Sequence, residues 1–206
     1  MSSVLIVTLL FAAAYLGFLY WYGGRGKSLT EAEMTRYVAE LIKSDPGEYN
    51  SAVIDQIKCL VANDDGNEFV MQNLVRYRTK ALYPKGNGVY GDDPRVADQR
   101  YARAIMWPLL KFGNLPIFIA KRTGHFITFE GAGTWHYVAM VRYRSRRDFL
   151  RFALMSSRRN GFIHKWAAID ETHVFPVKPI FSLVLVRTFV CGLMALCAFV
   201  VLLLLR

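Results

Sequence analysis

One histidine is the strongest candidate in the sequence for acid–base chemistry or ligand binding. His164 precedes the last expected strand. An imidazole whose pKa lies near neutrality can act as a general base or as a ligand. The neighbouring sequence offers it no evident carboxylate or cysteine partner. Two roles therefore stay open for His164: a candidate catalytic or ligand-binding residue in a cleft, or a structural ring that packs against Phe162 or Trp166.

A polar amide interrupts the apolar run at 69–75, FVMQNLV. Period-two alternation along a strand places Asn73 on the same face as Met71 and Tyr77. A buried amide must be hydrogen-bonded, so Asn73 either satisfies a nearby backbone group or lines a ligand cleft. If the domain binds a ligand, we expect Asn73, Tyr77 and His164 to converge on it.

Arginines face the opposite way at the end of the same strand. Arg76 and Arg78 would lie beside Arg142 and Arg144 if the first and third principal strands are neighbours. Such a group of guanidinium ions could bind a carboxylate, a phosphate or lipid head groups. The alternative is a solvated strand end.

The residues that usually hold metals or cofactors lack the necessary spacing. Cys59 is alone in the soluble part, and Cys191 and Cys197 lie in an apolar stretch. Haem ligation by one of the four histidines is conceivable, but there is no attachment motif. Neither a P-loop, nor a dinucleotide fingerprint, nor a Ser-His-Asp order occurs. We therefore predict no metal and no cofactor.

Two apolar stretches, 4–22 and 181–205, are predicted to be transmembrane helices. The first is uncharged and about long enough to cross ~30 Å of hydrocarbon. It ends in aromatic rings that prefer the head-group level and has no basic residue before it, so we interpret it as an anchor and not as a cleaved signal peptide. The second contains one charge, Arg187, whose side chain can reach the interface.

Basic residues flank both anchors on the side of the middle domain. Arg25 and Lys27 follow the first anchor, and Lys178 and Arg187 precede or begin the second. The positive-inside rule then predicts a multi-pass protein of the inner (cytoplasmic) membrane, with the soluble domain in the cytoplasm and both termini outside.

Charge divides the middle of the chain into two parts. The segment 28–66 is predicted to be helical, with a capping box from Thr30 to Glu33 and a second helix opened by Asp45 and Pro46. Residues 28–68 hold three bases and nine acids, whereas residues 69–180 hold nineteen bases and seven acids. The acidic segment could dock on the basic domain, or the basic face could lie on anionic lipid. Without a recognition motif, the overall charge of +10 does not indicate nucleic acid.

The segment 67–179 is predicted to be one α+β domain. Its expected strands are 69–75, 116–122, 125–130, 135–144 and 172–179, the last an edge because prolines interrupt it. Its expected helices are 95–112, kinked or divided at Pro108, and one capped by Ser145. The principal order of strand, helix, strand, strand, helix, strand is that of a ferredoxin-like fold. The first and third principal strands are apolar on both faces, so the face without helices needs a cover, either a partner sheet or the helical segment.

Four stretches carry a resemblance to a known family: FVMQNLVRYR (69–78), YARAIMWPLL (101–110), HYVAMVRYRSRRDFL (136–150) and HKWAAIDET (164–172). With them, 69–177 resembles the dimeric α/β-barrel superfamily, in particular a small bacterial domain family of unknown function. The segment 156–163 departs from it, being basic where the family tends to be acidic, and both anchors are foreign to it.

This resemblance implies a ferredoxin-like domain that dimerises by packing its sheet face on a second copy. It also matches His164 to the family's histidine, with Lys165 in place of the usual arginine. Relatives in the superfamily include cofactor-free monooxygenases, lactone isomerases and haem enzymes, so the fold does not determine the function.

Three functions remain open from the sequence. We expect a membrane-anchored cytoplasmic module that binds a small ligand or a partner protein without catalysis, its ligand-binding candidates being Asn73, Tyr77, Arg76, Arg142 and His164. The alternative is a membrane-tethered enzyme, similar to a monooxygenase or an isomerase, that acts on a lipophilic substrate. A third possibility is an accessory subunit of a larger membrane complex.

Overall fold

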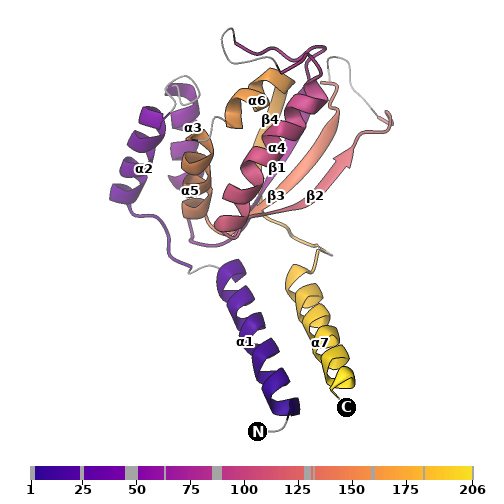
Figure 1. Cartoon of the computed structure of the whole chain (residues 1–206). Coiled ribbons are helices and arrows are strands. Elements are labelled where there is room, and N and C mark those ends of the chain that lie inside the picture. Colours follow the sequence, from indigo (N-terminus) through magenta and orange to yellow (C-terminus); the bar gives the residue numbers. More distant parts are fainter. Residues whose placement is uncertain are drawn as a thin grey trace. The chain divides into compact units, whose positions relative to one another are not determined.

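The computed structural model describes residues 3–23, 26–44, 51–62, 64–84, 90–127, 131, 133–158, 161–182 and 184–205. It has two compact units, each described by itself (Figure 1). One consists of Met1–Arg25 with Pro179–Arg206, and the other is Gly26–Lys178.

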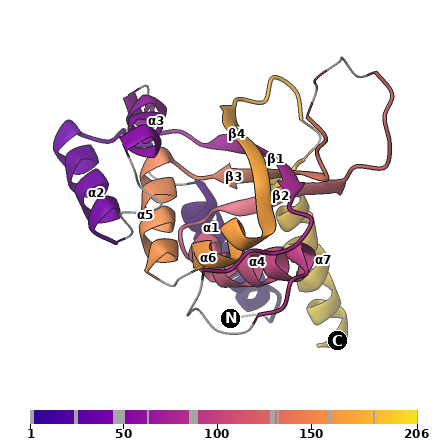
Figure 2. The same cartoon turned by 90° about the horizontal axis from the view of Figure 1, so that it is seen from above.

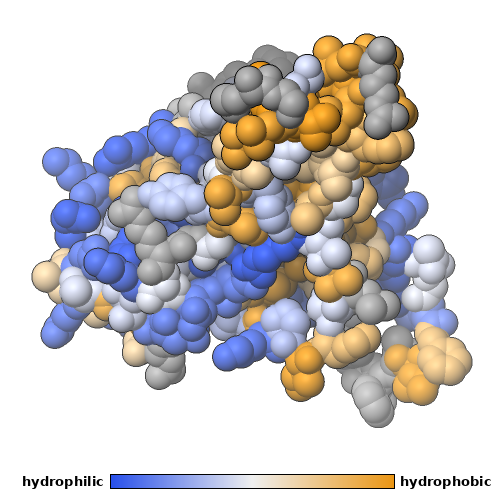
Figure 3. Space-filling view, turned by 90° about the horizontal axis from the view of Figure 1, so that it is seen from below, coloured by the Kyte–Doolittle hydropathy of each residue, from blue (hydrophilic) through white to orange (hydrophobic). Residues whose placement is uncertain are grey.

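The first unit contains two apolar helices, α1 (Ser3–Gly23) and α7 (Val186–Leu204). Both are long and apolar enough to cross a membrane. Within this unit they pack on each other: the Tyr15 hydroxyl donates to the Arg187 carbonyl at 3.3 Å, and the Arg187 guanidinium lies 4.9 Å from the centre of the Tyr22 ring. Hydrophobic side chains gather over these helices in Figure 3. The second helix begins at Val186, later than the stretch expected from 181.

The second unit is a mixed α+β domain built on one four-stranded sheet. Its strands are β1 (Phe69–Tyr77), β2 (Leu115–Lys121), β3 (Tyr137–Tyr143) and β4 (Ile169–Val177). They are ordered β2-β3-β1-β4, and each neighbouring pair is antiparallel. The proline-containing strand β4 lies at an edge, as predicted.

Three helices, α4 (Pro94–Lys111), α5 (Arg146–Ser157) and α6 (Gly161–Ala168), lie on one side of the sheet (Figures 1 and 2). The Asp93 carboxylate accepts the Arg95 amide and the Ser145 hydroxyl accepts the Asp148 amide, so side chains cap α4 and α5. Pro108 is buried in the last turn of α4 and does not divide the helix, which continues to Lys111.

The preceding acidic segment forms α2 (Glu31–Ser44) and α3 (Ser51–Ala62), which dock on α5. The predicted capping box is confirmed: the Thr30 amide donates to Glu33 at 3.0 Å, and the Glu33 amide donates to the Thr30 hydroxyl at 3.2 Å.

Leu41 of α2 and Leu150 of α5 are fully buried in a shared core. Arg147 bonds Glu33 at 2.9 Å and holds the pKa of its carboxyl at about 2. Of the two alternatives that the charge pattern left open, the structure shows the first, the docking of the acidic segment on the basic domain.

Residues 26–28, at the start of this unit, contact both α5 and the turn that precedes β1. Arg147 donates to the carbonyls of Lys27 and Ser28, each at 2.9 Å. Gly66 has a positive φ of 72°, and a Cβ built on it would lie 2.6 Å from the carbonyl carbon and oxygen of Gly26. Position 66 requires glycine for two reasons: its φ is positive, and the two chain segments approach each other too closely for a Cβ.

Two local predictions need correction, and one lies outside the described residues. His125–Ile127 of the expected strand 125–130 form no strand, while 128–130 are not described. Helix α6 is an addition, since the sequence pattern predicts no helix or strand at 161–168. The expected cap at Asp45 and Pro46 lies outside the described part.

Candidate functional site

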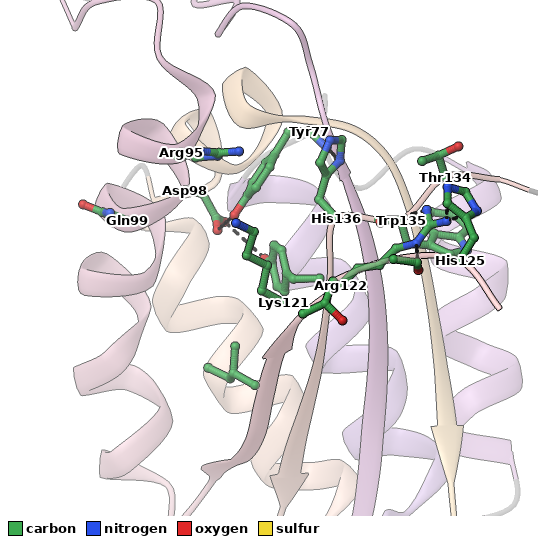
Figure 4. Close-up of a pocket in the computed structure, with 14 residues that line it drawn as sticks. Tyr77, Arg95, Asp98, Gln99, Lys121, Arg122, His125, Thr134, Trp135 and His136 are labelled. Carbon is green, nitrogen blue, oxygen red and sulfur yellow. Dashed lines mark hydrogen bonds between the residues drawn. The ribbon is translucent and has the colours of Figure 1, made fainter.

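A cavity of about 550 Å³ opens between the start of α4 and the ends of β2 and β3 (Figure 4). This volume is in the range of small-molecule sites. It is lined by side chains from β1, α4, β2, the β2–β3 connection and β3, the principal ones being Tyr77, Arg95, Asp98, Lys121, Trp135, His136 and Tyr137.

Asp98 is the polar centre of this cavity. The Tyr77 hydroxyl donates to its carboxylate at 2.8 Å, and the Tyr137 hydroxyl donates at 3.4 Å. Burial raises the pKa of Asp98, and the two hydrogen bonds offset part of that rise. Burial, followed by the charge of Asp98, raises the pKa of both phenols. Tyr77 and Tyr137 therefore remain protonated donors, and Asp98 is a carboxyl that can change its protonation state inside a cavity.

His136 is oriented by the backbone of β1. The Tyr77 amide donates to His136 Nδ1 at 3.1 Å. Because Nδ1 is the acceptor, the proton of the neutral ring is assigned to Nε2. The two rings are 5.4 Å apart, centre to centre. His136 thus contributes a fixed aromatic wall and a nitrogen donor to the cavity.

The rim is held by an arginine of the β2–β3 connection. Arg122 donates through Nε to the Gly124 carbonyl at 3.0 Å, and its amide donates to the His136 carbonyl at 2.9 Å. Its side chain also contacts His125. These bonds fix the position of the two segments that bear Lys121 and Trp135, so this side of the cavity is built by local contacts.

Of the residues expected from the sequence, only Tyr77 lines this cavity. Asn73 donates from its amide to the carbonyls of Met71 at 3.1 Å and Ala139 at 3.3 Å. Two backbone acceptors therefore hold this half-buried amide, which is the first of the two roles considered for it.

His164 lies in a separate aromatic cluster on α6. Its Nδ1 is 3.0 Å from the Tyr83 hydroxyl, and its ring is 5.0 Å from that of Tyr90, edge to face. Burial and the nearby charge of Arg100 lower the pKa of His164. Tyr83 and Tyr90, which come from the β1–α4 connection, are therefore packing partners of His164. The structural alternative had named Phe162 or Trp166.

The expected cluster of arginines does not form. The strands are antiparallel, so Arg142 lies opposite Val70, at the other end of β1 from Arg76. Arg76 instead pairs with Asp170 at 3.0 Å, while the buried Arg142 bonds Glu68. Although β1 and β3 are neighbours, their antiparallel direction places Arg76 and Arg142 at opposite ends of the pair.

No signal in the sequence marks Asp98 as part of the site. An acid in the first turns of an amphipathic helix is an ordinary surface residue, and only the packing of α4 on the sheet makes it half-buried. Lys121 and Tyr137 were equally hidden, because only the sheet register brings these two residues opposite each other. The described residues hold no cluster of three or more His, Cys, Asp or Glu that could bind a metal.

Comparison with known proteins identifies a fold likeness but no family. No protein-family model matches the chain, and no curated protein matches it. The chain is similar to the crystal structure of RPA0582, a protein of unknown function from Rhodopseudomonas palustris, with 22% identity and a TM-score of 0.55. The match covers 65% of this chain and 95% of that one. The structure of methylated RPA0582 matches with 23% identity and a TM-score of 0.54, over 64% and 93% of the two chains.

Proposed function

We propose that this protein is a membrane-anchored module that binds a small molecule in the cavity around Asp98. The observation that carries the proposal is a half-buried carboxyl that receives two phenol hydroxyls inside a cavity of ligand size. A carboxyl with a raised pKa and a few fixed polar groups among aromatic walls is typical of a binding site. The ligand candidates Asn73, Arg76, Arg142 and His164 lie outside this lining.

We further propose that Gly26–Lys178 contains a ferredoxin-like domain of the dimeric α/β-barrel type. The order β1, α4, β2, β3, α5, α6, β4 and the spatial order β2-β3-β1-β4 support it. Only α6 is additional to the β-α-β-β-α-β arrangement. Fold alone does not choose between binding and catalysis.

An enzyme remains the second candidate, and a specific observation favours it. Asp98 could accept a proton from a ligand, since its two phenol partners are donors and would stabilise the carboxylate. His136 lines the same cavity. The reaction class is that of proton abstraction from a small lipophilic substrate.

Asp98→Asn is expected to remove the ligand while leaving the fold intact or more stable. The folded-state pKa of Asp98 is raised, so protonation favours folding, and this contribution is lost as the pH rises through that pKa. The asparagine variant should therefore unfold at a temperature equal to or above wild type at pH 7, with the difference shrinking toward pH 4.

The matching measurement is mass spectrometry of small molecules extracted from the full chain purified from native membranes. Wild type and Asp55→Asn, which changes the same charge at an exposed site, should retain a compound that Asp98→Asn loses. Equal recovery from all three proteins would refute the proposed site.

We propose that both apolar helices span the inner membrane and that the α+β domain is cytoplasmic. Cys59 is exposed on α3, so it reports the side of the domain directly. In a variant carrying Cys191→Ser and Cys197→Ser, a membrane-impermeant maleimide should label Cys59 only after permeabilisation. A cysteine placed at Ser3 in a Cys59→Ser background should be labelled in intact cells. Labelling of Cys59 in intact cells would reverse the topology.

We propose a homodimer formed through the sheet face that carries none of α4, α5 and α6. The register places apolar side chains of all four strands on that face: Leu74, Phe118, Val138, Met140 and Phe175. Two such faces would bury each other.

Val138→Asp with Met140→Asp should convert the detergent-solubilised dimer to a monomer in light scattering, with unchanged circular dichroism. Val96→Asp, at an exposed apolar position of α4, should remain dimeric. A monomeric wild type at high concentration would contradict the proposal.

A further inference from the structure

We infer that the ligand of the Asp98 cavity is a small aromatic acid whose carboxylate is bound by Arg95 and Lys121. This inference rests on the binding function proposed above and adds the chemical class of the ligand.

The first argument is that these two cations have no partner. In the described part of the chain, the side chains of Arg95 and Lys121 form neither a hydrogen bond nor an ion pair, although both line the cavity. Arg158, also at the surface, is by contrast paired with Glu40 at 3.3 Å. A pair of unneutralised cations on one cavity is a complete recognition element for a carboxylate.

The second argument is their placement. Arg95 precedes Asp98 by about one helical turn on α4, so both residues face the same cavity. Lys121 lies opposite Tyr137 in the β2–β3 register, on the sheet face toward the helices. In Figure 4 the head groups of Arg95 and Lys121 both point toward the region of Asp98 and Tyr77. The cations therefore approach from the helix and from the sheet, on two sides of one opening.

Asp98 does not neutralise them. Neither cation is within ion-pair distance of its carboxylate among the described contacts. Burial moreover raises the pKa of Asp98, and an anion bound beside it would favour its protonated form further. Protonated Asp98 is a hydrogen-bond donor, so it would assist an anionic ligand instead of repelling it.

The walls of the cavity account for the aromatic part of the ligand. Tyr77 is 5.5 Å from Tyr137 and 5.4 Å from His136, centre to centre, and Trp135 lines the same opening. Aromatic rings pack against one another in offset or edge-to-face arrangements at such separations. A planar ring can be inserted among these walls, with its acid group directed to the cations at the mouth.

The test is calorimetric titration of the full chain in nanodiscs with three probes: benzoate, its neutral isostere benzamide and inorganic phosphate. Benzoate should bind at least about tenfold more tightly than benzamide, the scale expected of charge-assisted hydrogen bonds. Arg95→Gln and Lys121→Gln should each reduce benzoate affinity about tenfold and leave benzamide unchanged. Arg103→Gln is the matched control, because Arg103 is an exposed cation of the same helix outside the cavity lining. It should not alter either affinity.

The outcomes separate the two proposals. Equal binding of benzoate and benzamide, lost in Asp98→Asn, would overturn the anionic ligand and leave the binding function standing. Phosphate binding as tightly as benzoate would overturn the aromatic requirement. Binding of none of the probes would overturn the inference alone, because the binding proposal is decided by the compound extracted from native membranes. Loss of benzoate affinity in Arg103→Gln equal to that in the cavity variants would reduce the effect to general charge attraction and also overturn the inference.

Discussion

Gly66→Ala is expected to destabilise the α+β domain by roughly 2–5 kcal/mol, the sum of a left-handed backbone at a residue with a side chain and a main-chain clash. The added Cβ would lie 2.6 Å from the Gly26 carbonyl. Main-chain atoms cannot rotate away as a flexible side chain can, so the two segments must separate. Separation would also strain the hydrogen bonds from Arg147 to Lys27 and Ser28.

Gly91→Ala is the matched control for this change. Gly91 has a similar φ of 77°, but a Cβ there would meet no atom within 4 Å. Its substitution should cost only the backbone term, about 1–2 kcal/mol. Denaturant unfolding followed by circular dichroism would compare the two variants. If both lost the same stability, the close approach of Gly66 and Gly26 would have no energetic role.

Leu41→Ala is expected to lower the unfolding free energy of the whole domain by about 2–5 kcal/mol. Leu41 is 0% exposed and contributes to a core shared by α2, α3, α5 and α6. Truncation leaves a cavity in the contact between the acidic helices and the basic domain. The neighbouring Ile42 is 41% exposed, so Ile42→Ala should cost less than about 1 kcal/mol.

Two spectroscopic probes would show whether α2 and α3 unfold together with the rest of the domain. Tryptophan fluorescence follows the part of the domain outside α2 and α3, which contain no tryptophan, and includes Trp166 on α6. Far-ultraviolet circular dichroism follows all helices. The two should report one transition shifted equally by Leu41→Ala. An early loss of helix signal with an unshifted fluorescence transition would mean that α2 and α3 are an independent attachment.

Signals that act within a few residues were sufficient for most of the fold. Thr30 and Glu33 form a reciprocal cap, and Ser145 caps α5, because these interactions depend only on local spacing. The strands beginning at Phe69 and Tyr137 were likewise visible as apolar runs of strand length. Helix α6 was missed because eight residues offer few periodic positions, and its N-terminal Gly161 is a poor helix signal.

The candidate site was largely beyond the sequence for a different reason. Tyr77 was found by alternation, but its hydroxyl bonds Asp98, twenty-one residues away on a helix. His136 and Tyr137 enter the cavity because β3 is antiparallel to β1, and the same direction separates Arg142 from Arg76. Strand direction and the position of a helix over a sheet are tertiary properties. The spacing of residues along a single sequence does not reveal them.

The hydrogen bonds from Arg147 to the carbonyls of Lys27 and Ser28 define where a water-soluble fragment of this protein has to begin. Truncation at the first residue of α2, Glu31, would preserve every helix and strand of the domain. It would nevertheless remove both carbonyl acceptors from an arginine whose side chain is only 17% exposed, and a buried donor without an acceptor costs about 1–3 kcal/mol. A fragment that starts at Gly26 keeps both acceptors and the contact with Gly66. The domain boundary useful for protein production is therefore set by two backbone carbonyls upstream of the first helix of the domain.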